Sequence, residues 1–207
     1  IAELKSCLGY DPGRELTREE LSEMYLDNLK ASTPWPVKIA NIRLMLNTLE
    51  NGGSEEQVLH VATHLGNLVK VSETVVVRRR AGEALVSIID RMPLSQRNEI
   101  AVELGKGLEI GDYQFSKYIP DYLGMIMLHL PPRELDELIA DLEKFLGATN
   151  GQVAAAVLHT FGIVTENYNI YESVFGNAET AQARLSRKYK LISLIVRGFA
   201  NYNDTIS

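Results

Sequence analysis

Residues 150–166 read Asn-Gly-Gln-Val-Ala-Ala-Ala-Val-Leu-His-Thr-Phe-Gly-Ile-Val-Thr-Glu, and this stretch carries the pattern that decides the fold. Its core-type side chains recur at intervals of three and four residues, which places them on one side of a helix with 3.6 residues per turn. The stripe comprises Val153, Ala156, Val157, Thr160, Phe161 and Val164. Ala154 and Ala155 keep the adjoining flank small, so we expect a neighbouring helix to approach closely there.

Helical spacing continues along nearly the whole chain, with start signals at regular intervals. Residues 17–20 (Thr-Arg-Glu-Glu) and 54–57 (Ser-Glu-Glu-Gln) are capping boxes, in which two side chains satisfy amides at a helix start. Prolines stand where a first helical turn tolerates a missing N–H, at Pro34 and Pro36 and again at Pro131 and Pro132. The only β-branched run, residues 75–77, continues directly into three arginines and an alanine. The sequence therefore predicts an all-α fold.

These signals divide the chain into helical hairpins that repeat about every forty residues. The predicted pairs are 17–31 with 34–50, 54–70 with 73–91, 95–109 with 113–130, and 132–147 with 150–166, followed by a long C-terminal helix over about 178–201. Successive pairs start 37, 41 and 37 residues apart. Two helices at this period are the signature of an α-solenoid, here with about four antiparallel pairs in a single domain over 1–207.

Residues 77–85 (Val-Arg-Arg-Arg-Ala-Gly-Glu-Ala-Leu) resemble the second helix of a HEAT repeat, whose pattern is Val-Arg, then alternating Ala positions and a Leu. In the first predicted pair, Val37-Lys38 is a conservative version of this Val-Arg start. The third and fourth pairs have Tyr118 and Val153-Ala154 at the corresponding positions and lack the basic residue. The family often carries a proline in the first helix, but Pro120 falls early in a second helix. The resemblance, which extends to the armadillo-like repeats, implies a right-handed superhelix that commonly serves as a protein-binding scaffold.

The composition is that of an ordinary globular chain. The 207 residues include 27 acidic and 21 basic side chains, a net charge of −6, and 45% are hydrophobic. These values exclude intrinsic disorder and a disulfide scaffold. The single cysteine, Cys7, cannot form an internal disulfide, which favours a cytoplasmic location. No apolar run approaches the roughly 20 residues of a membrane helix. The start Ile1-Ala2-Glu3 carries neither Met nor a signal segment, so we expect either a piece of a longer protein or a processed chain.

The motifs that carry catalytic or metal chemistry are weak. His60 and His64 stand at i and i+4, a spacing that can share a metal, with Glu56 one turn earlier. The zinc-protease motif needs Glu directly after the first His, where Val61 stands. The apolar stripe of this helix instead places both histidines on a flank that we expect to be solvated. We predict no catalytic residue, metal or cofactor; a pocket uniting a histidine with carboxylates of another repeat is the enzymatic alternative.

Basic residues are concentrated in two places. Residues 181–203 hold five lysines and arginines, Arg187 and Lys188 among them, and no acid, while Arg78, Arg79 and Arg80 form a second group. One interpretation is ordinary solvated helix faces, with Arg78 bonded to a turn between helices. The other is a patch that binds an acidic protein or a nucleic-acid backbone.

Two apolar features near the C-terminus leave further alternatives. Residues 167–176 interrupt the repeat with three aromatics, which either form a strap over the final helices or anchor a partner. The last helix has a stripe that is suited either to capping the solenoid or to meeting another subunit. The stripe comprises Leu185, Tyr189, Ile192, Val196 and Phe199.

These observations predict a non-catalytic scaffold or regulatory module that binds a protein or peptide and has no membrane partner. The candidate contact residues are Arg78, Arg79, Arg80, Tyr168, Tyr171, Phe175, Arg187 and Lys188. The alternative is a nucleic-acid-binding repeat protein similar to the HEAT-type DNA alkylation repair proteins. That function requires the two basic groups to converge.

Overall fold

The computed structural model describes residues 15–109, 113–147 and 150–206. Its regular elements in these ranges are all helices, so the all-α prediction is confirmed for this part of the chain. The chain divides into two compact units, residues 1–92 and 93–207. One continuous domain over 1–207 stays a prediction.

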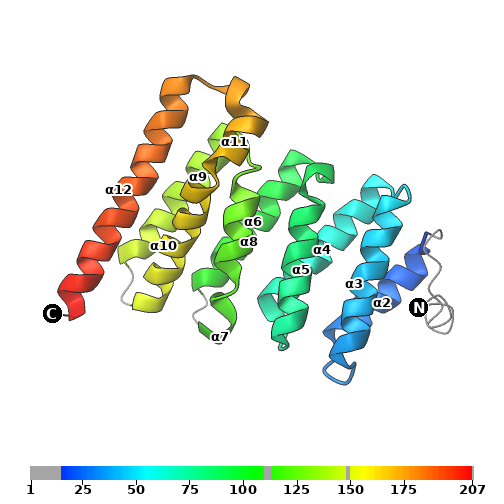
Figure 1. The fold of residues 1–207 in the computed structure, drawn as a ribbon. Coiled ribbons are helices and arrows are strands. Elements are labelled where there is room, and N and C mark those ends of the chain that lie inside the picture. The colour runs from blue at the N-terminus through cyan, green and yellow to red at the C-terminus, as the bar shows by residue number, and fades with distance from the viewer. Residues whose placement is uncertain (1–14, 110–112, 148–149, 207) are drawn as a thin grey trace. The chain divides into compact units, whose positions relative to one another are not determined.

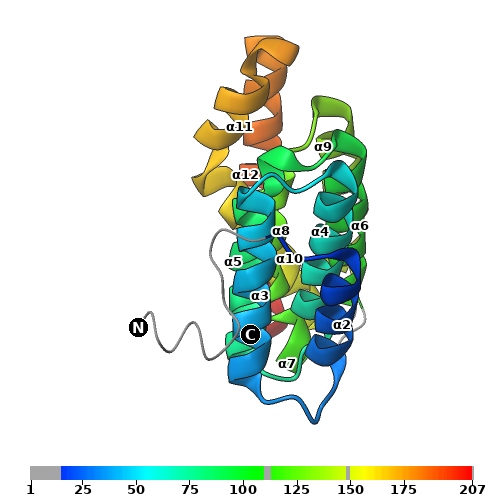
Figure 2. The same ribbon diagram turned by 90° about the vertical axis from the view of Figure 1, so that its right-hand side faces the viewer.

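The N-terminal unit contains two successive helix pairs. Its elements are α2 (Arg18–Leu29), α3 (Trp35–Glu50), α4 (Glu55–Val71), α5 (Val75–Ser87) and the short η1 (Ile89–Arg91). Figure 2 shows α2 and α4 on one side of this unit and α3 and α5 on the other. Helix α2 packs on α4, and α3 packs on α5. Within this unit, the second pair is therefore stacked on the first.

Local sequence signals explain where these helices begin and end. The Thr17 hydroxyl accepts from the Glu20 amide at 3.1 Å, and the Ser54 hydroxyl accepts from the Gln57 amide at 3.2 Å. Both capping boxes are complete, because the Glu20 and Gln57 side chains reach back to the cap amides. Between α3 and α4 the chain turns at Gly52, whose φ of 102° suits only a residue without a side chain.

The C-terminal unit begins with residue 93. Its elements are α6 (Leu94–Glu109), α7 (Tyr113–Ser116), α8 (Ile119–Met127), α9 (Pro132–Glu143), η2 (Lys144–Gly147), α10 (Gly151–Glu166), α11 (Tyr168–Phe175), η3 (Gly176–Ala178) and α12 (Ala181–Ile206). Helices α8, α10 and α12 lie side by side in this unit, and α6 packs on both α8 and α9 (Figure 1).

Two segments differ from the sequence prediction. The helix expected over 113–130 is divided, because Pro120 has no amide hydrogen to bond the carbonyl of Ser116, and α8 starts afresh with that proline in its first turn. From its sequence the segment 167–176 is expected only to interrupt the repeat, and the structure shows that most of it is itself helical and forms α11. The aromatics of α11 follow helical spacing, and Tyr168 and Tyr171 are buried.

The stripe of residues 150–166 forms the core of the C-terminal unit, as its spacing predicts. Each of its six members is buried, and Phe161 is fully so. The prediction that a neighbouring helix approaches closely at the small flank is wrong, because Ala155 is exposed. The close helix contacts are made at other positions. A Cβ on Gly124 would lie 2.6 Å from Ile163, and one on Gly198 would lie 2.5 Å from Leu158. Glycine at these positions lets α8 and α12 touch α10.

Replacing Phe161 with alanine tests this core. We expect Phe161→Ala to lower the free energy of unfolding by about 3–5 kcal/mol, since it removes a ring from a fully buried site. Urea denaturation measures the loss, and the half-buried ring of Phe175 offers the same substitution as a control with a smaller cost. A loss below about 1 kcal/mol for Phe161→Ala would show that its side of α10 is not the core.

Candidate functional site

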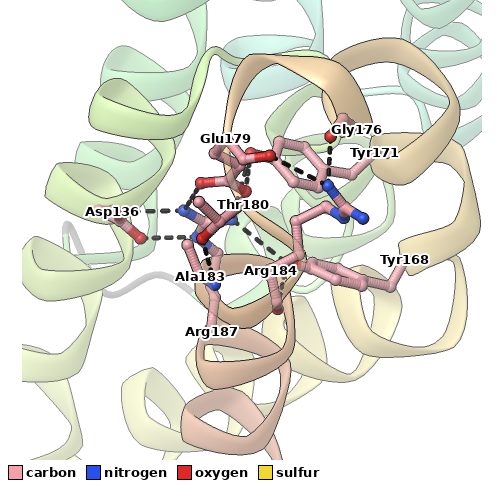
Figure 3. A network of polar contacts seen from close by, with 9 residues as sticks. All are labelled: Asp136, Tyr168, Tyr171, Gly176, Glu179, Thr180, Ala183, Arg184 and Arg187. Carbon is pink, nitrogen blue, oxygen red and sulfur yellow. Dashed lines mark hydrogen bonds and ion pairs between the residues drawn. The ribbon is translucent and has the colours of Figure 1, made fainter.

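A polar cluster around the buried guanidinium of Arg187 joins α9, α11 and α12 (Figure 3). The Arg187 side chain is 5% exposed and binds two carboxylates at once. Its Nε donates to Asp136 Oδ1 at 2.6 Å, and its Nη2 donates to Asp136 Oδ2 at 3.2 Å. Nη1 and Nη2 donate to the two oxygens of Glu179 at 2.5 and 2.8 Å. Paired and bidentate contacts of this kind are what a buried guanidinium requires.

Two tyrosines of α11 complete the cluster. Arg187 Nη1 donates to the hydroxyls of Tyr168 and Tyr171 at 3.2 and 3.1 Å. The Tyr171 hydroxyl donates to Glu179 Oε1 at 2.6 Å, and that of Tyr168 donates to the Arg184 carbonyl at 2.8 Å. The Arg184 guanidinium in turn donates to the carbonyls of Gly176 and Glu179. These bonds fix the turn between α11 and α12.

The pKa shifts in the cluster agree with a fixed charge distribution. Burial, followed by the bond to Glu179, raises the pKa of Tyr171, and burial raises that of Tyr168. Hydrogen bonds from Arg187 hold the pKa of Glu179 below its ordinary value. At neutral pH the cluster therefore contains a guanidinium, the ionised Glu179 and two neutral phenols. All three nitrogens of the Arg187 guanidinium donate within the protein, so this group has a structural role.

The structure corrects half of the predicted contact residues. Arg78, Tyr168, Tyr171 and Arg187 are buried within their own units and present no surface to a partner. Arg78 donates to the carbonyls of Ser72 and Lys70 at the turn between α4 and α5, the alternative that the sequence left open. A charged side chain is held inside here because the carbonyls of a helix end accept its hydrogens.

The other four candidates keep some exposure but do not form one group. Arg79 and Arg80 are exposed on α5 of the N-terminal unit. Phe175 and Lys188 are half-buried in the C-terminal unit. The Phe175 ring lies 5.9 Å from that of Tyr171, and Lys188 Nζ lies 5.9 Å above the Tyr168 ring. They therefore belong to the margin of the Arg187 cluster.

The two histidines of α4, His60 and His64, differ in how far their side chains are buried. His60 is exposed and its Nε2 lies 3.6 Å from Glu56, as expected for a solvated flank. His64 is 5% exposed, because α2 covers that flank, so the expectation of a solvated side chain is wrong for it. Asn28 Nδ2 donates to His64 Nε2 at 3.0 Å, and Asn28 Oδ1 accepts from Asn41 at 3.1 Å. In the described part of the chain, no group of three or more metal-ligating side chains comes together.

An open groove of about 1000 Å³ lies between α10 and the C-terminal half of α12. Its floor is a face of small residues on α10, comprising Gly151, Ala154, Ala155 and Gly162. A Cβ on Gly151 or Gly162 would meet nothing within 4 Å, so the space above both is open. Leu158, Ile195 and Phe199 supply apolar surface, and the side chains of Glu166 and Arg197 add charge. Sequence reasoning missed this groove, although the small flank of α10 was its visible signal.

Helix α12 is apolar on two sides. Leu191 and Leu194 are buried toward the core, on the same side as Arg187. The predicted stripe lies on the other side, with exposed fractions of 51% for Leu185, 63% for Tyr189, 37% for Ile192, 62% for Val196 and 56% for Phe199. The interpretation of this stripe as a surface buried against the repeats is therefore wrong, and the stripe faces solvent.

No protein-family model, curated protein or solved structure matches the chain. Among the described residues, no helix combines the length and the apolar character needed to cross a membrane. The groove and the exposed stripe are thus the candidate functional surfaces on geometric grounds alone.

His64 predicts a pH dependence of stability. Burial lowers its pKa from 6.5 to about 4, so the unfolded chain takes up this proton at a higher pH than the folded protein does. Its contribution to stability is complete above pH 6.5 and is lost as the pH falls toward 4, by about 3 kcal/mol in total. Urea denaturation at several pH values measures this loss. His64→Gln should flatten the decline and His60→Gln should not; equal declines in the two variants would refute the assignment.

Arg187 predicts a large stability effect from a single charge. Arg187→Met leaves Glu179, whose side chain is 10% exposed, without its cation, and we expect a loss of about 3 kcal/mol. Arg197→Met, at an exposed position of the same helix, should change stability by less than about 0.5 kcal/mol. Thermal denaturation of both variants is the measurement. Similar effects in the two would mean that the Arg187 cluster does not hold α12.

Proposed function

We propose that this chain is a non-catalytic interaction module, an α-solenoid similar to HEAT repeats, which holds a peptide segment of a partner protein in the α10–α12 groove. The observation that carries the proposal is the groove itself, open and floored by small side chains. The forty-residue period of the helix pairs and their stacking within each unit support the solenoid.

The composition of the groove suits a peptide. Its glycine and alanine floor lets a main chain approach α10 closely, and Leu158 and Ile195 offer apolar surface to a side chain. The side chains of Glu166 and Arg197 supply hydrogen-bonding groups of both signs. Apolar contacts combined with a few polar groups that fix orientation are typical of binding sites in proteins.

The groove is also held in place before binding. The contact between Gly198 and Leu158 sets the spacing of α12 and α10, and the Arg187 cluster fixes the start of α12. A preformed site spends less of its interaction energy on ordering its own side chains. The groove therefore favours a partner that inserts into an existing shape.

The nucleic-acid alternative loses support from the same structure. Arg78 and Arg187, one from each basic group, are buried and bonded to their own chain. Arg184 is bound to carbonyls at the start of α12. A phosphate backbone is recognised by cations that lie at the surface.

A peptide selection tests the groove. We expect peptides selected from a displayed library against the 207-residue chain to lose at least tenfold in affinity for Ala155→Arg, whose side chain would fill the groove. Ala140→Arg, an exposed position on α9 outside the groove, is the matched control and should bind as before. Circular dichroism confirms that both variants fold. Failure to enrich any peptide, or equal binding by both variants, would contradict the proposal.

A further inference from the structure

The exposed stripe of α12 has the spacing of a coiled-coil seam. Leu185, Tyr189, Ile192, Val196 and Phe199 succeed one another at intervals of four, three, four and three residues. This alternation gives the repeat of 3.5 residues at which one helix presents a continuous seam to another. Figure 1 shows α12 with α10 on one side, and the exposed fractions of 37–63% place the stripe on the solvent side.

The neighbours of the stripe permit a second helix to approach. The residues that follow its first, third and fifth members are Ser186, Ser193 and Ala200, which are small and uncharged. The exposed cations Lys190 and Arg197 directly follow the second and fourth members of the stripe. This position places them farther around the helix from the seam than the small residues are. Lys190 is also neutralised by Glu143, at 3.4 Å. The flank formed by Ser186, Ser193 and Ala200 therefore carries no charge. On the other flank Lys188 and Ile195 precede the second and fourth members of the stripe, and the Lys188 ammonium lies 5.9 Å over the Tyr168 ring.

The side chains of the stripe differ in size in an order that suits packing against a second copy of the stripe running in the opposite direction. When two α12 helices run antiparallel about a two-fold axis at Ile192, Leu185 faces Phe199 and Tyr189 faces Val196. Each large ring then meets a smaller aliphatic side chain, as close packing requires. In a parallel pair, by contrast, Tyr189 and Phe199 each meet their own copies. The sequence therefore favours the antiparallel arrangement, which also has the isologous symmetry of most dimers.

The area available is sufficient for a specific contact. The five side chains are 37–63% exposed, and covering them on two chains removes roughly 1000 Å² from water. That value reaches the lower bound for a biological interface before the serines, Ala200 and the stem of Lys188 are included. The uncovered apolar surface is roughly 500 Å² on each chain, which is at the upper end of the largest patches found on protein surfaces, and patches of that size are often functional.

We propose that two copies of this chain form a dimer through antiparallel pairing of their α12 helices along the Leu185–Phe199 stripe. The dimer goes beyond the proposed peptide-binding function and does not depend on it. Phe199 belongs to both surfaces, so the test rests on Val196, which does not line the groove.

Sedimentation equilibrium of the 207-residue chain at micromolar concentrations tests the dimer. We expect twice the mass of one chain, and a shift of at least tenfold in the dissociation constant for Val196→Asp. Arg197→Gln, one residue further and off the seam, changes the net charge by the same amount and should leave the dimer intact. Val196 is 62% exposed, so its variant is expected to fold, which circular dichroism verifies.

Cysteine cross-linking tests the direction of the helices, in a background in which Cys7 is replaced by serine. In the antiparallel pair, two copies of Leu185→Cys lie roughly 21 Å apart along the axis and should not cross-link. A mixture of Leu185→Cys and Phe199→Cys chains should form a mixed disulfide. A monomer at all concentrations, a dimer that Val196→Asp does not weaken, or cross-linking of Leu185→Cys to itself would each overturn the proposal.

Discussion

The ion-paired guanidinium of Arg187 is the interaction on which the C-terminal end of the chain depends. Three elements meet at it: Asp136 from α9, the tyrosines of α11, and Glu179 from the turn that leads into α12. Because two carboxylates and two hydroxyls accept its hydrogens, the charge is buried without being left unpaired. Its bidentate geometry fixes α12 both in position and in rotation about its own axis. The rotation decides which apolar side of that helix is buried and which remains at the surface.

The two candidate surfaces follow from that orientation. With Leu191 and Leu194 turned inward, one edge of α12 borders the α10 groove and the opposite side carries the Leu185–Phe199 stripe. The proposed peptide groove and the proposed dimer seam thus share one helix and one supporting cluster. A partner that binds in the groove and a second copy that binds along the stripe would meet near Phe199, so the two events are expected to influence each other.

Local signals in the sequence predicted the helices well, since each depends on neighbouring residues only. The capping boxes at Thr17 and Ser54 and the apolar spacing of residues 150–166 appear in the structure as predicted. Spacing could not predict which side of α12 is buried, because that helix has two apolar sides and the buried one includes an arginine. His64 was misplaced for a related reason: its burial depends on α2, which covers it from 36 residues away. Tertiary partners decided these cases.

Hydrogen exchange along α12 tests most directly whether the Arg187 cluster holds this helix against α10. The backbone amides of residues 185–198 should be protected to a degree similar to those of α10 in the intact protein. In Arg187→Met, protection should fall in α11 and α12 while the amides of α8 and α10 keep theirs. Unchanged protection of α12 in that variant, or equal loss across the whole C-terminal unit, would contradict the account.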